Sequence, residues 1–220
     1  MTDHHITIIA TLIALVFGVT LHEAAHGYVA KMFGDRTAEQ HGRLTLNPMA
    51  HADPLGTFLL PAIMFFSGSP FVFGYARPVP VNESILKPHR LGKFCVSFAG
   101  IIMNIFLAIL AGLLIHINPA GETFGNDILV ALIRINLVLA AFNLLPILPL
   151  DGGRIVNTLL PSRLAYEHSK SEPYGMLILL GLILLPALLQ PLGVGFDPLM
   201  MLLKPIYNTL MQVVMLFVVW

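Results

Sequence analysis

The hydropathy pattern divides the chain into long apolar runs separated by short polar segments. Residues 6–30 form an apolar run in which Glu23 is the only Asp, Glu, Lys or Arg. About 25 residues reach roughly 37 Å as a helix, which is enough to cross the hydrocarbon of a bilayer. Residues 94–117 form a second clean run of spanning length, and residues 128–145 form another that ends at Pro146. The pattern therefore predicts several transmembrane helices.

The other apolar segments are interrupted by proline and glycine. Residues 55–73 are interrupted by Pro61, Gly68 and Pro70, and a stretch rich in proline and glycine separates residues 174–189 from residues 205–219. The last two segments predict either two spans or one interrupted span. Residues 43–46 lie between turn signals in a polar stretch, which predicts a short strand.

The basic residues orient these segments. Lys and Arg are absent from residues 1–5 and 118–127, and they gather in residues 31–43, in residues 74–93 and after Asp151. Because cytosolic loops carry an excess of Lys and Arg, the N-terminus is expected to lie outside and the first span to end in the cytosol.

Both flanks of residues 55–73 would then lie in the cytosol, which predicts a re-entrant segment that dips into the membrane rather than a full span. We therefore expect an all-α integral membrane protein with a single domain over residues 1–220. It would contain a bundle of about five or six transmembrane helices, with a re-entrant, partly β-stranded segment between the first two core spans.

Composition supports the membrane assignment and excludes other classes. The chain is 56% hydrophobic and only 11% charged, which is unlike a soluble domain of 220 residues. A formal net charge of +0 provides no basic field for nucleic acid, so no nucleic-acid partner is expected. The hydrophobic composition makes the lipid bilayer the expected surroundings. The single Cys95 excludes an internal disulfide and a cysteine metal cluster.

Candidate chemistry lies inside the first apolar run, in the sequence His22-Glu23-Ala24-Ala25-His26. On a helix, two histidines four residues apart share one face and can bind one metal ion, with the glutamate beside them. This is the spacing of a zinc protease. A buried histidine can instead be a packed or hydrogen-bonded side chain, but three ionisable groups at membrane depth are costly and favour a functional site.

A catalytic zinc ion typically takes three protein ligands, so one more is needed. The extended zincin pattern would require Gly and His where the chain has Val29 and Met32. His22 lies about 24 Å from the outer edge of its helix, and Asp151 follows a span of similar length that also starts outside. Asp151 is therefore a candidate third ligand, although Asp-Gly-Gly is also typical of an ordinary turn. Asp35 and the other acidic residues in loops are expected to be solvated.

Several motifs in this order resemble the site-2 protease family of intramembrane zinc metalloproteases. They are the pentad at residues 22–26, the glycine-to-asparagine motif at residues 100–104, and the Asn-Leu-Leu-Pro-Ile-Leu-Pro-Leu-Asp-Gly-Gly sequence at residues 143–153. Residues 43–48, 51–56 and 73–82 are similar to its short prokaryotic branch, which lacks appended PDZ or CBS domains. The resemblance covers a core of residues 6–163 and leaves the C-terminal spans, residues 174–220, without a motif.

The resemblance implies a site and an activity. It implies that His22, His26 and Asp151 bind one catalytic Zn²⁺ and that Glu23 is the general base. The expected function is hydrolysis of peptide bonds within or near the transmembrane segment of a single-span membrane protein. The expected location is a prokaryotic cell membrane, with the active site towards the cytosolic side. The lack of a PDZ or CBS domain is compatible with a separate regulatory protein.

The resemblance also implies that Asn143 and Asn104 lie near the metal and contact the substrate or the developing oxyanion. For both, the alternative is an interhelical hydrogen bond between packed spans. Residues 71–81 could offer an edge for an extended substrate, or form a proline-stiffened loop at the membrane interface. Two rival functions are a transporter or metal-handling protein, with polar residues along a permeation path, and an inactive scaffold of the same fold.

Overall fold

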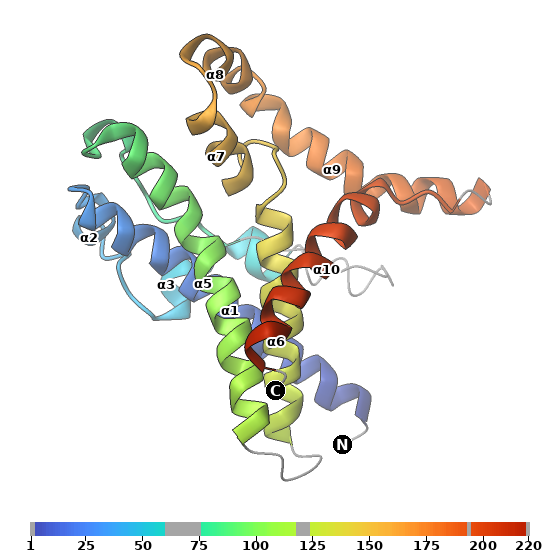
Figure 1. Ribbon diagram of the computed structural model, residues 1–220. Coiled ribbons are helices and arrows are strands. Elements are labelled where there is room, and N and C mark those ends of the chain that lie inside the picture. The colour runs from blue at the N-terminus through green and yellow to red at the C-terminus, as the bar shows by residue number, and fades with distance from the viewer. Residues whose placement is uncertain (1–2, 60–75, 118–123, 193–194, 219–220) are drawn as a thin grey trace.

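The computed structural model describes residues 3–59, 76–117, 124–192 and 195–218, and every regular element in these ranges is helical. Four long helices dominate the fold (Figure 1): α1 (Asp3–Met32), α5 (His89–Ile117), α6 (Phe124–Asn143) and α10 (Pro198–Val218). The shorter elements are α2 (Thr37–Gln40), α3 (Pro48–His51), a π-helical turn η1 (Pro54–Leu59), the 3-10 turns η2 (Glu83–Ile85) and η3 (Gln190–Leu192), α7 (Asp151–Leu159), α8 (Ser162–Ser169) and α9 (Glu172–Leu189).

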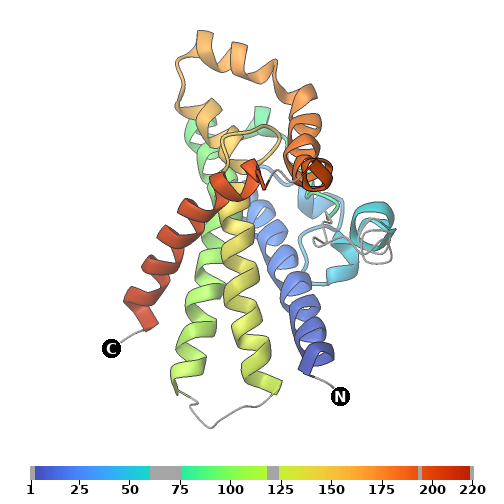
Figure 2. The same ribbon diagram turned by 90° about the vertical axis from the view of Figure 1, so that its right-hand side faces the viewer.

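The described residues contain four helices that are long and apolar enough to cross a membrane, one each within α1, α5, α6 and α10. The expected count of five or six spans is therefore not confirmed. Helix α9 is apolar but shorter, contains Pro186 and extends to one side of the bundle in Figure 1. Both views place the N- and C-terminal ends of the chain at the same end of the bundle (Figures 1 and 2).

The strand expected at residues 43–46 is absent, and these residues form an irregular loop between α2 and α3. Their backbone groups have local partners instead of a neighbouring strand. The Arg43 N–H donates to the carbonyl of Ala38 at 2.8 Å, and the Thr45 carbonyl lies 2.9 Å from His51 Nε2. Most of the expected re-entrant segment, residues 60–75, lies outside the described residues, so that prediction stays untested.

Small residues bring three of the spans into close contact. Helices α1, α5 and α6 all contact one another. Ala10 and Ala14 of α1 pack against Ala131 of α6, and Ala108 of α5 and Ala140 of α6 are fully buried in the main core. In membranes, small side chains allow helix backbones to approach closely, so that polar side chains can bond across the interface.

Helix α7 carries Asp151 as its first residue and is fixed at both ends. At its C-terminal end, the Arg90 guanidinium of α5 donates to the carbonyls of Thr158 at 2.5 Å and of Leu159 and Leu160 at 3.0 and 3.1 Å. At its N-terminal end, a Cβ on Gly152 would lie 2.4 Å from the carbonyl oxygen of Leu144. The glycine therefore lets the preceding loop fold directly onto α7, and the Asp-Gly-Gly sequence starts a packed helix.

The end of α1 shows that one sequence prediction was wrong. Gly34 adopts a left-handed conformation with φ of 97°, which ends the helix. The following Asp35 was expected to be solvated but is completely buried. Its carboxylate accepts hydrogen bonds from the backbone N–H groups of Thr37, at 2.8 Å, and Asn82, at 2.6 Å. Asp35 therefore ties the end of α1 to the segment that precedes η2.

Candidate metal centre

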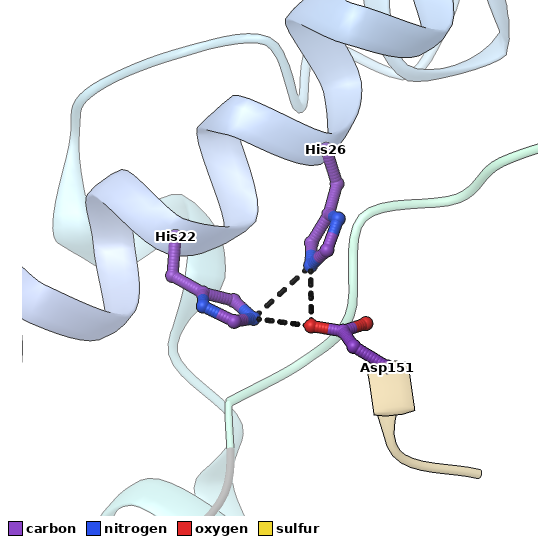
Figure 3. A group of neighbouring side chains, drawn as sticks. All are labelled: His22, His26 and Asp151. Atoms are coloured by element: carbon purple, nitrogen blue, oxygen red, sulfur yellow. Dashed lines mark hydrogen bonds and ion pairs between the residues drawn. The ribbon is translucent and has the colours of Figure 1, made fainter. Parts of the chain in front are cut away.

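Three of the predicted site residues meet at one point. His22 and His26 project from successive turns of α1 towards Asp151 at the start of α7 (Figure 3). The two histidine Nε2 atoms are 3.0 Å apart, and they lie 3.2 and 3.4 Å from Asp151 Oδ2. All three residues are at most 9% exposed. One ligand atom from each thus faces the same small volume.

The second nitrogen of each imidazole is bonded to α5. His26 Nδ1 lies 2.7 Å from the carbonyl oxygen of Val96, and His22 Nδ1 lies 2.6 Å from Asn104 Oδ1. A carbonyl oxygen can only accept, so His26 must carry its proton on Nδ1. The same holds for His22 if Asn104 presents its oxygen. Both Nε2 atoms then have a free lone pair, which is the form in which histidine binds a metal.

The donor set fits a zinc ion. In a tetrahedral site with Zn–N bonds of about 2.0–2.1 Å, the ligand atoms are about 3.3 Å apart, close to the spacing observed here. Asp151 Oδ2 is buried and has no hydrogen-bond partner among the described residues. In these tautomers one carboxylate oxygen and two nitrogen lone pairs face one another, an arrangement that a bound cation would stabilise.

Glu23 reaches the same cavity from α1 and is held by a backbone group. Its Oε2 accepts a hydrogen bond of 2.8 Å from the N–H of Val79. A Cβ on Gly27, one turn further along α1, would lie 3.1 Å from the Val79 side chain, so a glycine there allows the segment to come close. The contact orients the carboxylate in the cavity that His22, His26 and Asp151 also line.

The cavity has a volume of about 440 Å³ and lies between the helices and the segment around Val79. Its lining combines the predicted ligands and base with apolar and charged side chains. The lining residues are His22, Glu23, His26, residues 78–81, Glu83, Leu86, Lys93, Val96, Ser97, Asn143, Pro149, Leu150, Asp151 and Arg154. Glu83 pairs with Lys93 at 2.8 Å and with Arg154 at 3.4 Å, so an ion cluster forms part of this wall.

The two asparagines named from the resemblance have different positions. Asn143 lines the cavity, and its Nδ2 donates to the Leu139 carbonyl one turn back at 3.0 Å. Asn104 does not belong to the lining and is fully buried. It bonds His22, Asn136 and the carbonyl of Gly18, which agrees with the interhelical alternative. Of the two asparagines, only Asn143 borders the cavity.

The strand-addition hypothesis for residues 71–81 finds no support in the described part of that segment. Pro78 and Pro80 have no N–H group. The Arg77 N–H donates to the carbonyl of His51, and the Val79 N–H donates to Glu23. Residues 77–80 thus have no unbonded N–H to offer an extended substrate. His51 itself is buried, and its Nε2 lies 2.9 Å from the carbonyl oxygen of Thr45.

Sequence analysis missed two features of the site. Asn136 of α6 is fully buried and bonds Asn104, and its only signal was a polar residue in the middle of an apolar run. Gly100 was part of a recognised motif, but its role depends on packing: a Cβ there would lie 2.4 to 2.6 Å from atoms of the His22 ring. The absence of a side chain at this position makes room for the His22 imidazole.

Comparisons with known proteins find relatives of this chain. The family model for peptidase family M50 matches residues 10–126 and 120–186. The chain is 39% identical over 215 residues to the Bacillus subtilis protein named "Putative zinc metalloprotease YwhC", with 91% of this chain and 93% of that protein covered. It is 30% identical over 178 residues to Rip2 of Mycolicibacterium smegmatis, which carries the same descriptor (79% and 66% covered). It is also 30% identical over 161 residues to the zinc metalloprotease MJ0392 of Methanocaldococcus jannaschii (73% and 37% covered). No solved structure gives a significant match.

Proposed function

Because the chain belongs to peptidase family M50, the site-2 protease family of intramembrane zinc metalloproteases, we propose that His22, His26 and Asp151 hold its zinc ion and that Glu23 is the general base. The observation that carries this assignment is the convergence of three ligand atoms, all within 4.8 Å of one another, in the cavity that Glu23 also lines. His22, His26 and Asp151 come from two elements far apart in sequence. Such a meeting is expected of a metal site and has no other evident structural purpose.

The chain's own residues account for the proton transfers and the orientation of the substrate. Zinc, when bound, supplies a Lewis acid that activates water at neutral pH. Glu23 accepts the proton of the attacking water on its carboxylate and returns it to the amine nitrogen of the departing peptide. Asn143 is placed in the cavity where its amide can donate to the developing oxyanion.

The proposed substrate is a peptide bond within or near the transmembrane segment of a single-span membrane protein. A peptide bond in a helix is shielded by its own hydrogen bonds, so the substrate must unwind locally before it enters the cavity. Residues 78–81 line one part of the cavity, and the ion cluster of Glu83, Lys93 and Arg154 lines another part. Activity on extended peptides in detergent should therefore exceed activity on an intact helical segment of the same sequence.

For the orientation, we propose that both termini lie outside and that the metal centre lies towards the cytosol. The end of the bundle opposite the termini carries Lys31, Arg36, Arg90, Arg163 and Lys170 within or beside α1, α2, α5 and α8 (Figures 1 and 2). Single cysteines at Asp3 and His168, in a Cys95→Ser background, test this in intact cells with a membrane-impermeant maleimide. Labelling of position 3 alone is expected, and labelling of position 168 alone would reverse the orientation.

The function is tested with full-length protein in detergent or bilayers. Wild type should bind one zinc ion per chain and cleave single-span substrates. Glu23→Gln should retain zinc but lose at least about 100-fold in kcat, because a general base typically contributes 10²- to 10⁴-fold. The variant keeps the shape of the side chain and its ability to accept from Val79.

The outcomes separate the rival functions. Zinc binding with cleavage that does not depend on Glu23 would reject the assigned base. Zinc binding without cleavage of any substrate in a broad panel would favour an inactive scaffold. Zinc flux across vesicles that Glu23→Gln leaves intact would favour metal handling.

A further inference from the structure

The polar contacts behind His22 form a chain that runs across three helices. His22 of α1 bonds Asn104 of α5 at 2.6 Å, and Asn104 bonds Asn136 of α6 at 2.8 Å. Asn136 in turn donates to the carbonyl of Leu132 at 2.8 Å. Both asparagines are fully buried in the three-helix core, away from the cavity lining. Their contacts therefore act on the metal ligand and not on the substrate.

The backbone fixes which way each amide faces. The Leu132 carbonyl can only accept, so the Asn136 atom that faces it is the NH₂ group, and the Asn136 oxygen faces Asn104. Asn104 must then direct its NH₂ group to Asn136, and the same group lies 3.3 Å from the carbonyl of Gly18. This leaves the Asn104 oxygen for His22. The proton of His22 therefore lies on Nδ1, and its Nε2 lone pair faces Asp151 and the metal position.

We propose that Asn136 is a positioning residue that sets the tautomer of His22 through Asn104; this inference rests on the proposed role of His22 as a metal ligand. Without Asn136, the NH₂ group of Asn104 keeps only the long contact to Gly18. The Asn104 amide can then turn and donate to His22 Nδ1, which moves the imidazole proton to Nε2. A protonated Nε2 cannot bind zinc, so metal affinity falls although every ligand is still present.

The local packing is built around Asn136. A Cβ on Gly18 would lie 3.0 Å from Asn136 Oδ1 and 3.1 Å from the Leu139 side chain. Gly18 is one turn before His22 on α1, so α6 can bring its asparagine close to the helix that carries the ligand. His26 does not depend on an asparagine pair, because the Val96 carbonyl accepts from its Nδ1–H directly and so fixes the proton there.

The test measures the zinc dissociation constant of full-length protein in detergent by competition with a chromophoric chelator. Partners of a metal-bound histidine typically change affinity by 10- to 100-fold when they are removed. Asn104→Leu should weaken zinc binding within this range, and Asn136→Leu by about tenfold. In the Asn104→Leu background, Asn136→Leu should add less than twofold, because its effect requires Asn104. Independent, multiplicative losses would overturn the relay.

Two further variants separate positioning from packing. Leu137 is as buried as Asn136 and follows it on α6, so Leu137→Ala should lower the melting temperature but leave the zinc affinity within twofold. Asn136→Asp should restore most of the affinity, because a carboxyl group in the apolar core stays neutral and offers the same acceptor and donor. A loss in Asn136→Asp as large as in Asn136→Leu would reject the hydrogen-bond mechanism.

Cobalt supplies a readout that does not depend on activity. The visible absorption of Co²⁺ in the site should change in Asn136→Leu and remain as in wild type in Leu137→Ala. Failure of the wild-type protein to bind Zn²⁺ or Co²⁺ would reject the metal site itself. Normal binding by wild type together with an unchanged dissociation constant and spectrum in Asn136→Leu would reject only the role of Asn136.

Discussion

The two sides of the cavity hold their functional groups by different means. On the helical side, formed by α1, α5 and α6, the proposed ligand His22 is held by close contacts with a glycine and an asparagine, Gly100 against its ring and Asn104 behind it. On the segment side, formed by residues 77–81, the contacts come from the backbone. The Val79 N–H holds Glu23, and the Arg77 carbonyl accepts from Arg43 at 2.6 Å.

Because of this difference, substitutions on the two sides should have different effects on zinc binding and on kcat. On the helical side, a side chain added or removed next to a proposed metal ligand, or next to the asparagines behind it, changes the position or tautomer of that ligand and should alter zinc binding. A side chain changed on the segment side leaves the backbone group in place and should have little effect, unless the N–H itself is lost. Zinc affinity should therefore report on the helical side, and kcat at saturating zinc should report on the segment side.

The largest effect is expected for Gly100→Ala. The new Cβ would lie 2.4 Å from Cε1 and 2.5 Å from Nε2 of His22, so the imidazole must leave its place. We expect zinc affinity to fall by about 100-fold, the upper end of the effects seen when the orientation of a metal ligand is disturbed. Chelator competition measures it. The loss would occur although alanine favours a helix over glycine by about 1 kcal/mol.

Gly112→Ala is the matched control on the same helix. A Cβ at Gly112 would lie 2.5 Å from a Val218 methyl group, so it should disturb packing near the end of α10 without touching the site. Its zinc affinity should equal that of wild type even if its melting temperature changes. Equal losses of affinity in Gly100→Ala and Gly112→Ala would mean that general loosening of α5, and not displacement of His22, is responsible.

An intermediate effect is expected for Val79→Pro, which removes the N–H that Glu23 accepts from. Val79 precedes Pro80, which favours an extended backbone at position 79, and proline itself adopts extended conformations. A hydrogen bond to a charged group contributes about 1.5–3 kcal/mol, so kcat should fall about tenfold or more while zinc affinity is retained. Val79→Ala keeps the N–H and should stay within about threefold of wild type. A similar fall in kcat for both variants would show that the valine side chain matters more than its backbone.

The sequence predicted the helical side of the site better than the segment side. His22 and His26 obey helical spacing, and Asp151 could be matched to them by depth, so their meeting followed from elementary geometry. Nothing in the sequence pattern specified that the Val79 N–H would bond Glu23, because a backbone group is the same at every position. Asn136 was visible as a polar residue in a span, but its partner on another helix depends on how α5 and α6 pack.

The long helices were likewise predicted better than the loops between them. The three-helix core follows from apolar runs long enough to cross a bilayer. The prediction of a strand at residues 43–46 was wrong. Tertiary contacts, including the hydrogen bond from Arg43 to the Arg77 carbonyl, outweighed the turn signals and the β-propensity of these residues. The prediction that Asp35 is solvated was wrong for a related reason. A loop position does not reveal that the distant Asn82 N–H, together with the nearby Thr37 N–H, will bond a buried carboxylate.

The smallest effect is expected for Arg43→Met, which tests whether residues 77–81 depend on hydrogen bonds from a side chain outside the cavity. Arg43 Nη2 donates to the carbonyl of Arg77 at 2.6 Å and lies 3.5 Å from that of Pro78, so it steadies the two residues that lead into Val79. Methionine keeps the apolar stem and removes the donors. An ordinary hydrogen bond contributes about 0.5–1.5 kcal/mol, and only part of that reaches Glu23 through the backbone, so kcat should fall about threefold with unchanged zinc affinity.

Arg36→Met is the control, since Arg36 lies 4.0 Å from Glu39 at the surface and should leave kcat unchanged. If Arg43→Met weakened zinc binding instead, the two sides of the cavity would be mechanically coupled, and the separation between ligand positioning and base positioning would have to be abandoned.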